Sequence, residues 1–229
     1  GHLQAIERRI AGSAAAVATD GNEGDLDEEE RLNLLRRYRN DELLRVGLRD
    51  VGGELAVDEV ATALTDLAEA CIEAALQTVR TDVERRFGRP RTPFAVLALG
   101  KLGAGELGYA SDLDLLFLFG DDEALVDPPA ATSSSGSGRT AFEVMSRLGQ
   151  RLIHGLGAHL PAGRLYEVDT RLRPSGQQGA LVSSLAGFAR YHAGRSALWE
   201  RQALIKLRTV AGDAALGAQA EAIAGRHVW

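Results

Sequence analysis

The chain has 229 residues, of which 45% are hydrophobic and 25% charged, and its formal net charge is −6. This length suits one large or two small globular domains with a sizeable core. The acidic balance argues against a nucleic-acid partner, because phosphate backbones are held by clustered lysine and arginine. Cys71 is the single cysteine, which excludes an internal disulfide and favours a reducing compartment.

No signal peptide and no apolar run long enough to span a bilayer stand out. We therefore expect a cytoplasmic protein with no membrane partner. The chain begins with Gly1 and His2 instead of methionine, so we expect a tag remnant on a fragment of a longer protein.

Helical signals dominate the first 90 residues. An alanine-rich, weakly amphipathic helix is expected over 3–18. A second helix is expected to start after Asp27, with Glu30 as its capping-box partner, and to end at Gly52. We therefore predict an N-terminal helical segment over residues 1–90.

A longer helix is expected to start near Asp58. Its apolar residues recur at spacings of three and four, which indicates one buried face: Val60, Leu64, Leu67, Cys71, Ala75, Val79 and Val83. Because Cys71 lies on this stripe, we interpret it as a packing residue instead of a reactive thiol.

The pattern changes after the proline-rich segment 88–93. The short apolar runs 94–99 and 113–119 lack helical spacing and predict buried strands. A mobile surface loop is expected over 120–138, since it holds prolines and a serine/glycine tract.

A helix is predicted over 140–156 and a third strand over 164–172, and two or three helices are expected after Ser184. These elements predict an α+β fold.

A glycine-rich turn follows the first predicted strand. Gly100 and Gly103 would let the backbone approach phosphate oxygens, and Lys101 adds positive charge. The turn is not a Walker A loop, because the Gly-Lys-Ser/Thr ending is missing. On its own it is weak support for a phosphate site.

Two carboxylates come next, at Asp112 and Asp114. In a strand both would point to the same side, and neighbouring carboxylates repel each other unless a cation lies between them. A divalent metal with phosphate on its far side is the usual solution. The alternative is a solvated strand end.

The segment 166–176 supplies the third feature. If 164–172 is a strand, then Glu167, Asp169, Arg171 and Arg173 share one face. Such a face suits a site that holds metal and phosphate together. A salt-bridged exposed strand face is the alternative interpretation.

These motifs carry a resemblance to the nucleotidyltransferase superfamily with the DNA-polymerase-β-like fold, which has a short mixed sheet with helices. The stretches GKLGAGELGYASDLDLLFLF, LYEVDTRLRPSGQQGALV and WERQALIKLR resemble more closely the glutamine synthetase adenylyltransferase family. The resemblance covers about residues 30–215. It implies a nucleotidyltransferase catalytic domain over 91–195 with a core of that type, helical segments before and after it, and the start of a truncated C-terminal helical region over 196–229.

Members of that family attach AMP to a tyrosine of glutamine synthetase in one half of a long chain, and remove it in the other half. Four positions resemble the adenylylating half: Gly108, Glu167, Ser175 and Gln202. The resemblance therefore implies transfer of AMP from ATP, with release of pyrophosphate. Glutamine synthetase would be the protein substrate, and a PII-type signalling protein could act through other parts of the full enzyme.

The resemblance also implies the site residues. Asp112, Asp114 and Asp169 would be catalytic and would hold Mg²⁺, as two ions. The residues implied for ATP are Gly100, Lys101, Gly103, Ser111, Arg171 and Arg173. Lys206 and Arg208 could face the phosphates, but solvation at the surface is the preferred interpretation. A zinc site at His154 and His159 is rejected, because the two do not share a helix face.

Three alternatives remain open. The chain could be a deadenylylating half that uses phosphate to release ADP, or a nucleotide-binding module that is inactive as an isolated fragment. A polymerase or RNA-tailing enzyme shares the chemistry, but it should carry a basic groove.

Overall fold

Three helices form the N-terminal part of the chain: α1 (His2–Thr19), α2 (Glu28–Val51) and α3 (Val57–Phe87). The computed structural model describes residues 1–19, 26–121, 123–129 and 139–228. The three helices expected in this part of the chain are present, and the predicted capping box is confirmed. The Glu30 amide donates to Asp27 Oδ1 at 2.8 Å, and the Asp27 amide donates to Glu30 Oε2 at 3.0 Å.

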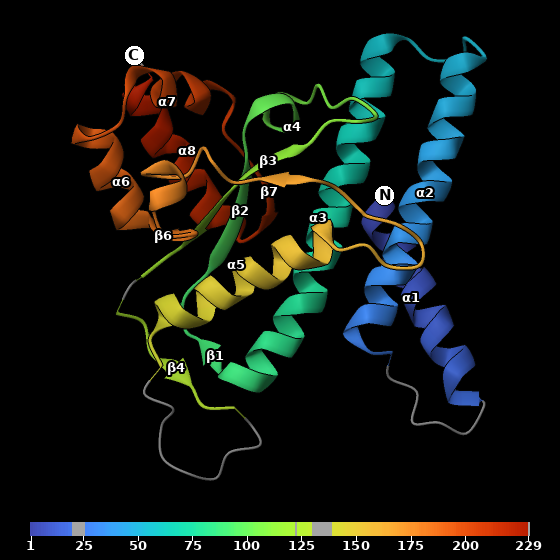
Figure 1. The fold of residues 1–229 in the computed structure, drawn as a ribbon, viewed down its shortest axis with the longest axis horizontal. Coiled ribbons are helices and arrows are strands. Elements are labelled where there is room, and N and C mark those ends of the chain that lie inside the picture. The colour runs from blue at the N-terminus through green and yellow to red at the C-terminus, as the bar shows by residue number, and fades with distance from the viewer. Residues whose placement is uncertain (20–25, 122, 130–138, 229) are drawn as a thin grey trace.

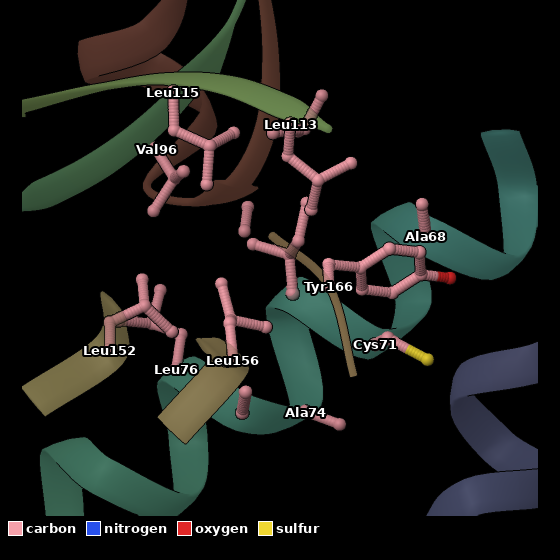
Figure 2. Close-up of a cluster of buried hydrophobic side chains, with 14 of the residues drawn as sticks. Ala68, Cys71, Ala74, Leu76, Val96, Leu113, Leu115, Leu152, Leu156 and Tyr166 are labelled. Atoms are coloured by element: carbon pink, nitrogen blue, oxygen red, sulfur yellow. The ribbon is translucent and has the colours of Figure 1, made fainter. Parts of the chain in front are cut away.

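The apolar stripe of α3 is buried along its whole predicted length. It packs toward the sheet, where Figure 2 shows Ala68 and Cys71 of α3 on one side and Leu113 and Leu115 on the other. Burial raises the pKa of the Cys71 thiol to about 12, so it stays neutral. The interpretation of Cys71 as a packing residue is confirmed.

A short mixed sheet lies beside these helices (Figure 1). Its strands are β2 (Phe94–Ala98), β3 (Leu113–Phe119), β5 (Val168–Asp169), β6 (Val182–Ser184) and β7 (Arg208–Gly212). The order is β5-β3-β2-β7, and β6 also pairs with β3. β2 runs antiparallel to both β3 and β7, whereas β5 and β6 run parallel to β3. The predicted strands over 94–99 and 113–119 are therefore confirmed.

The sheet has two buried faces, because β2 and β3 alternate their side chains between two apolar clusters. Val96 and Leu115 join the cluster of α1–α3 and α5 (Ala141–Gly157). Leu97 and Leu116 join the cluster beneath α6 (Leu185–Gly194) and α8 (Ala214–His227). Figure 1 shows these two helix groups on opposite sides of the sheet. The arrangement is of the α+β class, as predicted.

The short elements connect these layers. They are β1 (Arg89–Pro90), α4 (Gly100–Ala104), β4 (Val126–Asp127), η1 (Gly176–Gln178), α7 (Leu198–Ala203) and η2 (Leu204–Lys206). β4 lies inside the predicted loop 120–138 and pairs with β1, which precedes the sheet. Residue 122 and residues 130–138 of that loop lie outside the described residues. Among the helices that the structure describes, none has the length and apolar character needed to cross a membrane.

Two predictions about the sheet are wrong. The strand expected over 164–172 is reduced to the two residues of β5, since the amides of Leu165 and Tyr166 both donate to the Leu156 carbonyl at the end of α5. β6 and β7 were not predicted as strands. β7 falls within 196–229, the segment expected to start a helical region, and it extends the sheet beside β2.

Candidate active site

Asp114 and Asp169 are direct neighbours across the parallel pair β3–β5. Register partners on adjacent strands point to the same side of a sheet, so the two carboxylates share one face. Asp112 is exposed just before β3. It lines the same open depression as Asp169, together with Glu167, Val168, Thr170, Arg171 and Arg173. The structure thus gathers the three predicted acids at one edge of the sheet.

The position of Asp169 is fixed by the residues that precede it. Tyr166 is buried, and Figure 2 shows its ring above α3 near Ala68 and Cys71. The guanidinium carbon of Arg39 lies 4.9 Å from the centre of this ring. The Leu113 amide then donates to the Glu167 carbonyl at 2.9 Å. This anchoring brings β5 alongside the start of β3.

The two strand carboxylates have opposite electrostatic surroundings. Burial raises the pKa of Asp114, and the negative charges of Asp112 and Asp169 raise it further. A hydrogen bond from Arg171 lowers the pKa of Asp169. Within the described residues, the Asp114 carboxylate has no hydrogen bond or ion pair of its own. The edge therefore carries more negative charge than its own residues compensate.

Both oxygens of Asp169 are engaged by Arg171. The backbone amide of Arg171 donates to Oδ1 at 2.8 Å, and its Nε donates to Oδ2 at 2.7 Å. Nη2 lies 2.5 Å from Oδ2. In the parts of the chain that the structure describes, no three histidine, cysteine or acidic side chains stand ready to hold a metal ion.

The donor set nevertheless fits a hard divalent cation such as Mg²⁺, which prefers carboxylate oxygens. The observation that carries this fit is the Asp114 carboxylate, which is partly buried, has no hydrogen bond or ion pair with any residue that the structure describes, and is crowded by two other acids. A cation bound there would relieve the repulsion that raises its pKa. The residues that would hold it are Asp112, Asp114 and Asp169.

The predicted glycine turn is the short helix α4, and its first residue touches the acids. Gly100 has φ +55°, and a Cβ at this position would lie 2.1 Å from Oδ2 of Asp114. Only glycine fits this contact. Lys101 is exposed, and the Ser111 hydroxyl oxygen accepts a hydrogen bond from the Gly108 amide at 3.1 Å. Neither of these two residues lines the acidic depression.

Gly103, which was predicted to approach phosphate, is buried against protein backbone. A Cβ there would lie 2.0 Å from the Lys206 carbonyl oxygen and 2.8 Å from that of Ala98. The structure therefore shows a packing reason for this glycine. It lets α4 sit tightly against η2 and the end of β2.

Arg173 does not extend a strand face with Asp169 and Arg171, so that prediction is wrong. Its Nη1 donates to Thr170 Oγ1 at 2.7 Å and to the Thr170 carbonyl at 3.0 Å, and its Nε donates to the Gly179 carbonyl at 3.3 Å. These bonds close the turn after β5. Arg173 still lines the depression, and Thr170 joins it there as a polar residue that the sequence analysis did not single out.

Arg208 was expected to be solvated, and this is also wrong. It donates to the carbonyls of Leu102 and Gly103 at 3.0 and 3.2 Å, and it forms an ion pair with Glu69 at 2.5 Å. A cation suits these carbonyls at the end of α4. Lys206 is half exposed and pairs with Glu106 at 3.2 Å.

Comparison with known proteins identifies the family. Residues 3–223 match the family model described as Glutamate-ammonia ligase adenylyltransferase. A protein of Thioalkalivibrio sulfidiphilus (strain HL-EbGR7) is 42% identical over 199 residues, which cover 82% of this chain and 20% of that protein. A protein of Nitrosococcus oceani is 44% identical over 204 residues, which cover 84% of this chain and 20% of that protein.

Both relatives are named bifunctional glutamine synthetase adenylyltransferase/adenylyl-removing enzyme. The chain spans about a fifth of the length of these curated relatives. The matched segment includes the acidic edge, the helix α4 and the strand β7. On these matches, the chain belongs to the glutamate-ammonia ligase adenylyltransferase family.

Proposed function

We propose that this chain catalyses the Mg²⁺-dependent transfer of AMP from ATP to a tyrosine of glutamine synthetase, with release of pyrophosphate. The observation that carries the proposal is the pairing of Asp114 with Asp169 across β3 and β5, with Asp112 beside them. This arrangement agrees with the polymerase-β-like core that the motifs suggested. The relatives' names supply the substrate.

The chemistry that the bound metal supplies is neutralisation of charge on the α-phosphate and a lower pKa of the attacking hydroxyl. The metal would be present as two Mg²⁺ ions, held by Asp112, Asp114 and Asp169. Asp169 is also the candidate to accept the proton of the tyrosine hydroxyl, because its carboxylate lines the depression.

Positive charge for the triphosphate is available on two sides of the acids. Arg171 is exposed within the depression, and Lys101 is exposed on α4. Gly100 and Ser111 lie on the segments that flank Asp112 and Asp114, and we retain both as ATP-contacting residues. Gly103 would act indirectly, through the packing of α4.

We assign the chain to the adenylylating half. Gly108, Glu167, Ser175 and Gln202 are the residues that resemble this half. Glu167 is exposed at the depression, where it pairs with Arg164 at 3.2 Å. A cytoplasmic location, glutamine synthetase as protein substrate and a PII-type regulator of the longer enzyme complete the proposal.

Mass spectrometry of glutamine synthetase after incubation with this chain, Mg²⁺ and ATP tests the proposal. We expect a tyrosine peptide heavier by one AMP, and pyrophosphate as the second product. A parallel reaction with adenylylated glutamine synthetase and phosphate tests the reverse assignment. Release of ADP in that reaction, without any forward transfer, would assign the chain to the deadenylylating half.

Calorimetry with Mg·ATP separates catalysis from simple binding. If the chain binds ATP but modifies no tyrosine of glutamine synthetase, even when the chain is in excess over glutamine synthetase, it would be a nucleotide-binding module. That result would reject the enzymatic proposal for the isolated chain.

A further inference from the structure

Arg171 occupies the acidic edge in a way that the predicted roles do not explain. Arg171 lines the open depression, yet its amide, Nε and Nη2 all contact the Asp169 carboxylate, at 2.8, 2.7 and 2.5 Å. Both oxygens of Asp169 therefore already accept from Arg171, and the guanidinium charge lies where a metal would have to approach Oδ2.

The charge of Arg171 acts on all three acids. Its pKa is raised first by the hydrogen bond to Asp169, and the charges of Asp112 and Asp114 raise it further. It also opposes the rise in the Asp114 pKa. Arg171 thus provides positive charge where the carboxylates would otherwise only repel one another.

The arginine side of this contact is open to solvent. The side chain of Arg171 is 69% exposed, whereas that of Asp169 is only 14% exposed. Exposed ion pairs are weak ties, and a guanidinium is well suited to bind phosphate oxygens instead. The depression that Arg171 lines offers room for such a movement.

We propose that Arg171 is a built-in counter-cation of the acidic edge, which blocks Asp169 from divalent metal until the phosphates of the nucleotide draw the guanidinium away. The inference rests on the proposed function, since it assumes that the three acids hold the metal. In this role Arg171 is a positioning residue for Asp169. It makes metal binding at Asp169 dependent on nucleotide binding.

Two affinities measured on the nucleotide-free and metal-free protein test the proposal. The first is the affinity for Mn²⁺, followed by electron paramagnetic resonance of the free ion. The second is the affinity, in EDTA, for an ATP analogue with a carbon bridge between the α- and β-phosphates, which cannot transfer AMP. The variant is Arg171→Gln. The matched control is Arg164→Gln, which removes the same charge from the exposed pair with Glu167.

We expect Arg171→Gln to bind Mn²⁺ about fivefold more tightly or better, the size expected when one nearby like charge is removed. We expect the same variant to bind the analogue more weakly, by about fivefold. Arg164→Gln should change both affinities by less than about twofold. The two affinities should change in opposite directions, whereas loss of a merely structural arginine would weaken the binding of both Mn²⁺ and the analogue.

Equal Mn²⁺ affinity in Arg171→Gln and the wild-type chain would overturn the proposal while leaving the metal site intact. Tighter Mn²⁺ binding with unchanged analogue binding would overturn the link to nucleotide. If Mn²⁺ binds to neither the wild-type chain nor the variants, and the analogue binds no more tightly with Mn²⁺ than in EDTA, the proposed function fails together with this inference.

Discussion

The interior and the acidic edge of the sheet use their residues in contrasting ways. Between α3 and the sheet, apolar side chains such as Leu67, Leu115 and Leu152 are almost fully excluded from solvent. At the edge, the carboxylates of Asp112, Asp114 and Asp169 lie close together with one ion pair among them. The interior stabilises the fold by burying apolar area, whereas the edge retains carboxylate repulsion that Arg171 offsets only in part. Substitutions should therefore separate stability from activity.

The largest effect is expected from Asp114→Asn. Loss of one metal-holding carboxylate should slow AMP transfer by about 10³-fold or more. The free energy of unfolding should stay the same or rise slightly, since a partly buried charge without a partner is removed. Transfer assays and urea unfolding measure the two quantities.

Asp66→Asn is the matched control, because Asp66 is exposed on α3. Its transfer rate should equal that of the wild-type chain. Near-normal activity of Asp114→Asn would contradict the assignment of Asp114 to the active site.

The converse effect is expected from Leu67→Ala. Leu67 is 1% exposed in the interior, so its truncation should lower the free energy of unfolding by about 2–5 kcal/mol. The rate per folded molecule should not change. Leu48→Ala on the exposed side of α2, where the side chain is 65% exposed, should alter stability by no more than about 0.5 kcal/mol.

His192 is an exception within the interior and gives a pH-dependent test. It is 2% exposed, neither ring nitrogen has a hydrogen-bond partner among the described residues, and burial lowers its pKa to about 4. Glu200 favours the charged ring, while His227 and Arg201 disfavour it. Because the unfolded chain takes up a proton that the folded chain does not, stability present above pH 6.5 should be lost as the pH falls toward 4.

This loss should amount to about 3 kcal/mol for His192 alone. His192→Phe should show a smaller loss of stability between pH 7 and 4 in urea unfolding, whatever its stability at pH 7. Identical pH dependence in the two proteins would show that His192 is accessible to protons in the folded state.

A smaller effect on stability is expected where the backbone meets the acidic edge. Gly100→Ala forces a side chain into a left-handed backbone position and against the Asp114 carboxylate. We expect a loss of about 1–2 kcal/mol in stability and about tenfold in transfer rate.

Gly105→Ala serves as its control. Gly105 has φ +74°, with nothing within 4 Å of an added Cβ. It should show a similar loss of stability and retain its activity. Equal activity of both variants would argue against contact between Gly100 and a working carboxylate.

The sequence predicts the interior better than the edge, and the reason is periodicity. The stripe from Val60 to Val83 and the apolar runs of β2 and β3 are local patterns, which packing against neighbours preserves. The Asp27 capping box is equally local. These features were predicted with boundaries close to those observed.

Most of the missed features depend on partners that are distant in the chain. β7 is a strand because it pairs with β2, although it directly follows the helical residues of α7 and η2. Arg208 is held by carbonyls about a hundred positions earlier. The alternation expected over 164–172 fails after β5, since Arg173 folds back on Thr170. None of these contacts leaves a local pattern.

The pairing of β7 with β2 has a consequence for dissecting this protein. A shorter version cut at residue 195 would remove both the strand that covers β2 and the arginine that caps α4. The unpaired amides and carbonyls of β2 would then form an exposed edge strand that can pair with other chains, and such edges promote aggregation. Any minimal catalytic unit should therefore extend past Gly212.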